Sequence, residues 1–257
     1  MIYLYIFAAL ILIGAVLYLI PLFHTTKPTL PVLLFGPVGI SIPNAPASAQ
    51  GFSVSRLEKL LILLQKKQFS PVLPTQITDE AALPQKPILL LFSGGFQTIF
   101  TDVFPLLQKY QFKAAVALPV SCIGQYDIWN TKGPWQNILT ASQLKTLQQS
   151  GLIEFISQGL DNTPLHTLPA EIAAWQLQES KTRLHNLYHL DVKAVLVPGQ
   201  TVLNADLWAA ARQEYPLILD RKTGSNLLPL QTQTPLTVFP VSKHSHLHRL
   251  CWRLTRP

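Results

Sequence analysis

The clearest candidate for a site is a Ser-Gly-Gly turn at residues 93–95, which directly follows an apolar run at 87–92. Such a run, bounded by proline and glycine, is typical of a strand buried on both faces. In α/β folds ligands bind at the carboxyl ends of these strands, and a glycine pair lets the chain turn sharply or lets a ligand approach closely. Position makes this turn a candidate site, although Ser93 alone supplies no acid, no base and no good metal ligand.

A second candidate is the histidine cluster near the end of the chain, which consists of His244, His246 and His248. Alternate residues of an extended segment point to one side, so these imidazoles could together hold a metal ion. No carboxylate accompanies them, and the alternative is a solvated basic tail whose arginines could touch an anionic surface.

A third candidate is the segment between Cys122 and Ile138, which carries Tyr126, Trp129 and Trp135 among glycines and a proline. This composition predicts a loop, and loops commonly carry function. Exposed aromatic rings could stack on the apolar faces of sugar rings. The alternative is that the same rings pack over the carboxyl end of the strands.

Strand and helix patterns alternate along the rest of the chain, which argues for a β/α barrel or a doubly wound sheet. Ser55 with Glu58, and Thr140 with Gln143, have the spacing of helix capping boxes. The predicted strands lie at 30–36, 87–92, 112–118, 152–156, 192–197, 216–219 and 236–241. Core candidates on the predicted helices are Leu57, Leu60, Leu61, Leu64, Trp175, Leu177, Leu184 and Leu187.

Composition narrows the class of protein. The 257 residues suffice for one α/β domain with a full core. A net charge of +7 could favour anionic glycans, lipid headgroups or nucleic acid, but no aromatic-basic motif supports nucleic acid, which is not an expected partner. Cys122 and Cys251 are too few for a disulfide scaffold, and the sequence leaves one bridge or two free thiols open.

The amino terminus is apolar from residue 2 to residue 23, with no charge before Lys27. About 20 such residues span a bilayer, which predicts a transmembrane anchor at 1–24, with a cleaved signal peptide as the alternative. We expect a linker at 25–29, a folded domain at 30–242, a basic tail at 243–257, and a membrane-anchored protein whose domain lies outside the cytoplasm.

The segment 86–96 resembles the first motif of the polysaccharide deacetylases of the NodB-homology type, whose strand ends in Thr-Phe-Asp-Asp-Gly-Tyr. Four further segments resemble motifs of that family in the same order along the chain. They are 32–36, 112–118, 157–162 and 192–199. The resemblance implies a distorted seven-stranded β/α barrel within an α/β fold.

The reactive residues of the family are replaced at the matching positions. The catalytic base and a metal-binding aspartate correspond to Ser93 and Gly94, and the two metal-binding histidines correspond to Gln158 and Asn162. The histidine of the opening strand corresponds to Gly36, and the Pro-Tyr-Gly motif is one residue short after Pro198. The resemblance therefore implies a degenerate member that has lost the family's zinc.

The sequence thus favours an inactive deacetylase-like protein that binds a cell-envelope polysaccharide or an envelope protein. One alternative is a hydrolase with a rebuilt site, for which Ser93, His166 or the histidine cluster would supply the groups. The other is an interaction scaffold, in which Phe35, Phe92 and Phe96 would fill the pocket.

Overall fold

We analysed a computed structural model of the chain, which describes residues 28–40, 51–78, 83–131, 134–199, 205–224, 226–230 and 234–254. The predicted membrane anchor and most of the predicted linker lie outside these ranges.

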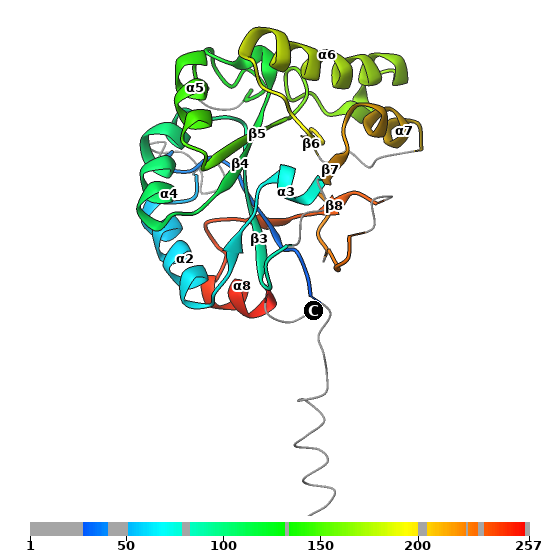
Figure 1. Ribbon diagram of the computed structural model, residues 1–257. Helices are drawn as coiled ribbons and strands as arrows, with labels where there is room; N and C mark the ends of the chain where they lie inside the picture. The colour runs from blue at the N-terminus through cyan, green and yellow to red at the C-terminus, as the bar shows by residue number, and fades with distance from the viewer. Residues whose placement is uncertain are drawn as a thin grey trace, which may run out of the picture.

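One parallel sheet curves into a nearly closed barrel (Figure 1). Its order is β8-β7-β6-β5-β4-β3-β1-β9, with β2 paired to β3 off this path. The strands are β1 Val32–Phe35, β2 Ser70–Pro71, β3 Pro87–Ser93, β4 Ala114–Leu118, β5 Ile153–Ser157, β6 Ala194–Leu196, β7 Leu217–Asp220, β8 Leu236–Thr237 and β9 Phe239–Val241. Only Val238 separates β8 from β9, so the run 236–241 pairs with β7 at its start and with β1 at its end. This shared run joins the two edges of the sheet, and the predicted α/β barrel is confirmed.

Alternation along the strands separates two cores. Val32 and Leu34 of β1 and Leu89 and Leu91 of β3 belong to an inner cluster that also contains β4, β6 and β7 residues. Their neighbours in sequence, such as Phe35, belong to an outer cluster shared with the helices. Because side chains of a strand point to opposite faces in turn, strands such as β1 and β4 are apolar on both faces, which explains their unbroken apolar runs.

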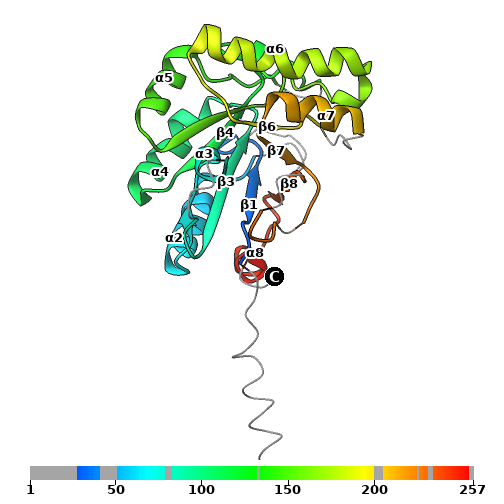
Figure 2. The ribbon, with the colours of Figure 1, turned by 45° about the vertical axis from the view of Figure 1, so that its right-hand side comes forward.

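The helices are α2 Val54–Lys66, α3 Pro74–Thr78, α4 Phe104–Tyr110, α5 Ala141–Gln149, α6 Ala170–Tyr188, α7 Ala205–Glu214 and α8 Leu247–Leu254. All of them except α3 cover the outside of the barrel in chain order, as Figures 1 and 2 show. The short helix α3 instead packs on the inner core through Ile77. A π-helical turn, η2 Ile99–Val103, precedes α4, and 3₁₀ turns lie at η3 Val120–Cys122 and η4 Leu165–Thr167.

The helix starts agree with the sequence in one case and differ in another. Thr140 and Gln143 form both hydrogen bonds of the capping box of α5, as predicted. The cap of α2 is Ser53, whose hydroxyl accepts from the Arg56 amide, so the predicted Ser55–Glu58 box is wrong. Glu58 instead faces outward and pairs with Lys109 of α4.

Burial confirms most core candidates and corrects two. The four leucines of α2 and Leu177 and Leu184 of α6 are fully buried. Trp175 and Leu187 of α6 are 47% and 64% exposed. α6 packs on the barrel along one side only, so apolar residues on its other side stay at the surface.

The carboxyl-terminal segment does not form a simple tail. It contains α8, which contacts α2, and Leu250 and Leu254 of α8 are buried in the outer core. The residues beyond 254 lie outside the described ranges.

The prediction of a membrane-anchored protein is corrected by the helices of the structure. Within the described residues, no helix is both long and apolar enough to cross a bilayer. The apolar run at 2–23, from which the anchor was predicted, lies outside them.

Candidate functional site

The candidate site lies at the carboxyl ends of the barrel strands. β1 and β3 pair with Phe35 opposite Phe92, which places Gly36 beside Ser93 one residue further on. Both follow inner-core residues at alternate positions, so both face the barrel axis. Gln158 follows inner-core Ile156 in the same way on β5, and Pro198 follows Leu196 on β6. The fold therefore brings the family's site positions to one end of the barrel.

Hydrogen bonds join these positions directly. The Gln158 Oε1 accepts from the Gly94 backbone amide at 2.9 Å, and the Gln158 Nε2 donates to the Asn162 Oδ1 at 2.6 Å. Gln158 is only 1% exposed, so its amide exchanges its hydration for these two partners. The two amides thus bridge the β3 turn and the segment after β5.

The Ser93 side chain forms a hydrogen bond with the backbone. Its buried hydroxyl donates to the Phe35 carbonyl at 3.1 Å, which ties the carboxyl ends of β3 and β1 together. Within the described residues no histidine forms a hydrogen bond with it. A serine nucleophile needs an adjacent base, so this geometry offers no general base to Ser93.

Space beside Gly94 is taken by an aromatic ring. Gly94 has φ +90°, a conformation that favours glycine, and a Cβ added there would lie 2.5 Å from Cε2 of Phe96. Phe96 is itself buried, in a small cluster with Ile40, Cys122 and Ile138. An aspartate at position 94, as in the family, would therefore clash with the ring.

The residues present do not fit the family's metal. Glycine offers no side-chain ligand at Gly36 and Gly94, and the amides of Gln158 and Asn162 are poor ligands for zinc beside imidazole and thiolate. Over the described parts of the chain, no group of three or more His, Cys, Asp and Glu side chains could hold a metal ion.

The histidines that could have replaced the lost groups lie elsewhere. His244 and His246 occupy the turn after β9, and His248 lies on α8, so the three do not alternate along one extended strand. His166 lies in the 3₁₀ turn η4 and is exposed.

The loop that carries Tyr126, Trp129 and Trp135 is hydrogen-bonded to the Ser-Gly-Gly turn after β3. The Leu139 amide donates to the Gly95 carbonyl at 2.8 Å, and the Gln97 amide donates to the Asn137 carbonyl at 2.8 Å. These bonds fix the base of the loop at the carboxyl end of β3, next to the site positions.

The three aromatic residues of this loop divide into two roles. Tyr126 and Trp135 are 51% and 60% exposed, and their ring centroids lie 6.2 Å apart. Trp129 is half-buried and packs edge-on against Phe96, with ring centroids 6.2 Å apart. Asp127 holds the loop between them, because its carboxylate accepts from the Gln136 amide at 2.5 Å, and burial raises the pKa of this carboxyl.

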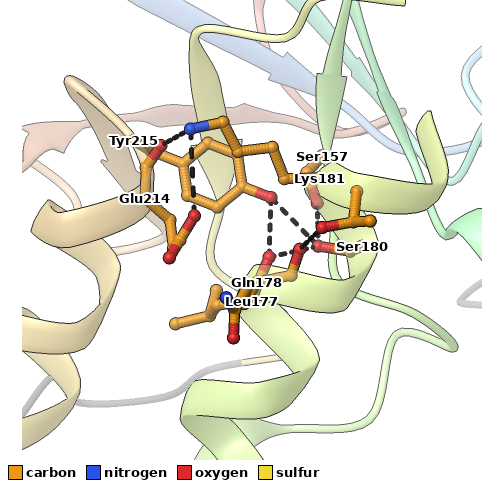
Figure 3. A network of polar contacts seen from close by, with 8 residues as sticks. Ser157, Leu177, Gln178, Ser180, Lys181, Glu214 and Tyr215 are labelled. Atoms are coloured by element: carbon orange, nitrogen blue, oxygen red, sulfur yellow. Dashed lines mark hydrogen bonds and ion pairs between the residues drawn. The ribbon is translucent and has the colours of Figure 1, made fainter. Parts of the chain in front are cut away.

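Sequence reasoning missed a buried polar network behind the site (Figure 3). The Ser157 Oγ lies 2.9 Å from the Ser180 Oγ and also accepts from the Gly159 amide. The Tyr215 hydroxyl lies 3.0 Å from the Ser180 Oγ and donates to the Leu177 carbonyl. Burial raises the pKa of Tyr215 to about 12. Because Ser157 directly precedes Gln158, this network fixes the end of β5 against α6 and α7.

The ammonium group of Lys181 lies next to Tyr215 at the edge of this network. The Lys181 Nζ donates to the Glu214 carbonyl, lies 3.8 Å from the Glu214 carboxylate, and stands 5.6 Å from the centre of the Tyr215 ring. The network joins residues that are 23 to 38 positions apart in the chain, and no local sequence pattern predicts such contacts.

Comparison with known proteins gives the family. The profile of the polysaccharide deacetylase family matches residues 80–217, more than half of the chain. The Bacillus subtilis protein YxkH, named for the same family, is 24% identical over 149 residues, which are 58% of this chain and 50% of that protein. The poly-β-1,6-N-acetyl-D-glucosamine N-deacetylase of Staphylococcus epidermidis is 25% identical over 131 residues, 47% of this chain and 43% of that protein. The chain thus spans half or less of the length of these curated relatives.

Solved structures agree in fold. The Streptococcus pyogenes deacetylase PplD, determined with acetate, has a TM-score of 0.74 at 17% identity and covers 90% of this chain and 100% of its own. IcaB from Ammonifex degensii has a TM-score of 0.70 at 16% identity, over 89% of this chain and 98% of its own. With the family profile matching more than half of its length and the barrel matching these two structures in fold, the chain belongs to the polysaccharide deacetylase family.

Proposed function

We propose that this chain binds a polysaccharide of the cell envelope at the carboxyl end of the barrel and does not deacetylate it by the family's metal-dependent mechanism. The observation that carries the proposal is the occupation of the metal-ligand positions by Gly94, Gln158 and Asn162, with the two amides bonded to each other and to the Gly94 backbone. Metal-dependent hydrolysis needs a metal-bound water and a base to deprotonate it, and among the described residues of the barrel end we find no side chain for either role.

Binding is favoured by the surface next to the same turn. Tyr126 and Trp135 present two exposed rings on a loop fixed to Gly95, and aromatic side chains supply large contact area at low entropic cost. Asn162 is only half-buried, and amide groups like the one it carries recognise sugar hydroxyl and acetamido groups. Curated relatives carry names that specify poly-β-1,6-N-acetyl-D-glucosamine, which makes that polymer the first ligand to test.

The test is calorimetric titration of the full chain with β-1,6-linked N-acetylglucosamine oligosaccharides and with peptidoglycan fragments, with acetate release assayed in the same samples. We expect saturable binding without acetate release, and weaker binding by a Tyr126→Ala, Trp135→Ala double variant. Release of acetate would contradict the loss of catalysis.

An interaction scaffold is the second candidate, and the filling of the Gly94 space by Phe96 favours it. In that case titrations with every glycan show no heat of binding, although the chain is folded and stable. A Trp135→Ala variant separates the two readings, because it weakens binding only if glycan binds at the exposed ring. Trp129→Ala is the comparison, since Trp129 packs on Phe96 and contributes to stability in both readings.

A further inference from the structure

A basic groove runs along the outside of the barrel, between α2 and the segment that enters α8, which lie together in Figure 1. Its volume is about 520 Å³, within the range of roughly 300–1,000 Å³ that small-molecule sites occupy. The lining residues are Arg56, Lys59, Ile62, Leu63, Lys66, His246, Leu247 and His248. None of the site positions at the barrel end lines it, so the groove is a separate surface.

The charged residues that line the groove are all basic. Arg56, Lys59 and Lys66 carry positive charge at neutral pH, and none of the lining residues is acidic. The one acidic residue of α2, Glu58, points to α4, where its carboxylate accepts from Lys109 at 2.8 Å and from the Tyr110 hydroxyl. A groove lined by one sign of charge concentrates the field and attracts anions.

The first cation of the groove is held in place. The Arg56 guanidinium donates to the Ser245 carbonyl and stands 5.3 Å from the centre of the Phe52 ring. These contacts hold the guanidinium against the segment that carries His246. A cation that is already positioned loses little entropy when it meets a ligand.

The spacing of the cations indicates an extended ligand. Lys66 follows Arg56 by ten residues on one helix, which places the two about 15 Å apart along the helix axis at 1.5 Å per residue. A single phosphate or carboxylate cannot meet both. A linear chain with repeated anionic groups can.

The floor of the groove distinguishes between polyanions. Ile62, Leu63 and Leu247 are aliphatic, and among the residues whose side chains the structure describes no aromatic ring lines the groove. Proteins that bind single-stranded nucleic acid stack the bases on aromatic side chains, which none of these lining residues supplies. Aliphatic side chains suit the apolar faces of sugar rings. We propose that the groove between α2 and α8 binds a linear anionic polysaccharide, with Arg56, Lys59 and Lys66 contacting successive acidic groups.

The experiment titrates the full chain with an oligogalacturonate hexamer, a neutral N-acetylglucosamine hexamer, a hexaglutamate peptide and a single-stranded hexanucleotide. The groove variant is Lys59→Gln, Lys66→Gln. The matched control is Lys67→Gln, Lys145→Gln, which removes the same charge from exposed lysines outside the groove. Thermal unfolding of both variants verifies that they fold.

We expect the oligogalacturonate to bind, with an affinity that falls as salt rises because salt screens exposed charges. The groove variant should bind it roughly two- to thirtyfold more weakly, the effect of removing two exposed charge contacts, and the control should bind it as the unaltered chain does. Equal weakening in both variants would overturn the proposal, since it would show attraction by overall charge. Absence of oligogalacturonate binding, or tighter binding of the peptide or the oligonucleotide, would also overturn it.

The two proposals of glycan binding fail separately. If the neutral hexamer binds the unaltered chain and the groove variant equally well, it binds at the barrel end. If the neutral hexamer does not bind, the result for oligogalacturonate at the groove still stands.

Discussion

Replacement of Gly94 by alanine tests whether the space for the family's metal ligand is closed. The backbone there has φ +90°, and the added Cβ would lie 2.5 Å from Cε2 of Phe96 and 3.1 Å from two more atoms of the ring. Two penalties therefore combine at this position. The matched control is Gly124→Ala, because Gly124 has φ +76° but no atom within 4 Å of the added Cβ.

The magnitudes follow from these two terms. Alanine at Gly124 meets only the left-handed backbone penalty, about 1–2 kcal/mol. Alanine at Gly94 meets that penalty and the overpacking of a buried ring, about 1–3 kcal/mol more. We expect Gly94→Ala to lower the free energy of unfolding by about 2–5 kcal/mol, and a Phe96→Ala background to remove the overpacking part.

The assay is urea unfolding followed by circular dichroism, with both glycine variants measured alone and in the Phe96→Ala background. A coupling of about 1–3 kcal/mol between Gly94 and Phe96, with none between Gly124 and Phe96, is the expected result. Equal losses for the two glycine variants would refute the reasoning, because the ring would then leave room for a side chain at position 94.

Three further predictions concern the network, a buried thiol and the aromatic loop. Tyr215→Phe should lower the free energy of unfolding by about 1–3 kcal/mol at neutral pH, because the Ser180 hydroxyl and Leu177 carbonyl lose a buried partner. The pKa of Tyr215 is raised to about 12 from 10.0, so its protonated form stabilises the fold below pH 10, and that stability is lost as the pH rises from about 10 to 12. Urea unfolding across this range should show the loss in the unaltered chain and not in Tyr215→Phe. In a Cys251→Ser background, Cys122 should react with a thiol reagent at neutral pH at least about a hundredfold more slowly than a free thiol, because burial raises its pKa to about 11; a fast reaction would contradict its burial. Trp135→Ala should weaken glycan binding by more than about 1 kcal/mol without a change in the unfolding midpoint, and an unchanged affinity would remove the ring from the site.

The barrel could be predicted because its strands carry the signal locally. Runs such as Leu89–Phe92 are apolar at every position, and only strands with cores on both sides require that. The order of the segments along the chain then resembled one family. The capping box of α5 was likewise local, since Thr140 and Gln143 lie within one turn.

The site was predictable as a set of positions but not as a set of contacts. The sequence matched Gln158 and Asn162 to the family's two histidines, yet the bond between Gln158 and Gly94, 64 positions apart, depends on how β3, β4 and β5 assemble in the sheet. The ring of Phe96 beside Gly94 depends on the backbone conformation of the turn, which glycine leaves open in sequence. Ser53 caps α2 although an arginine, Arg56, stands three residues after it, so the capping-box spacing of Ser55 and Glu58 indicated the wrong start.

The carboxyl-terminal segment was misread for a related reason. Its histidines and arginines suggested a solvated tail, but Leu250 and Leu254 fall four apart on one helical face and reach the core. Leu247, Leu250 and Leu254 have helical spacing, but a segment of eight residues is too short for this periodicity to identify a helix from sequence alone. Packing on α2 decides the structure.

Titration of the full chain with zinc, accompanied by an assay of acetate release from β-1,6-linked N-acetylglucosamine oligosaccharide, tests whether the barrel end lacks metal-dependent deacetylation. We expect no zinc binding at the barrel end and no acetate. A variant with His244, His246 and His248 replaced by glutamine identifies any heat that arises from those residues. Micromolar zinc binding that survives in this variant and supports acetate release would contradict the account, because the positions of Gly94, Gln158 and Asn162 would then have to be served by other ligands.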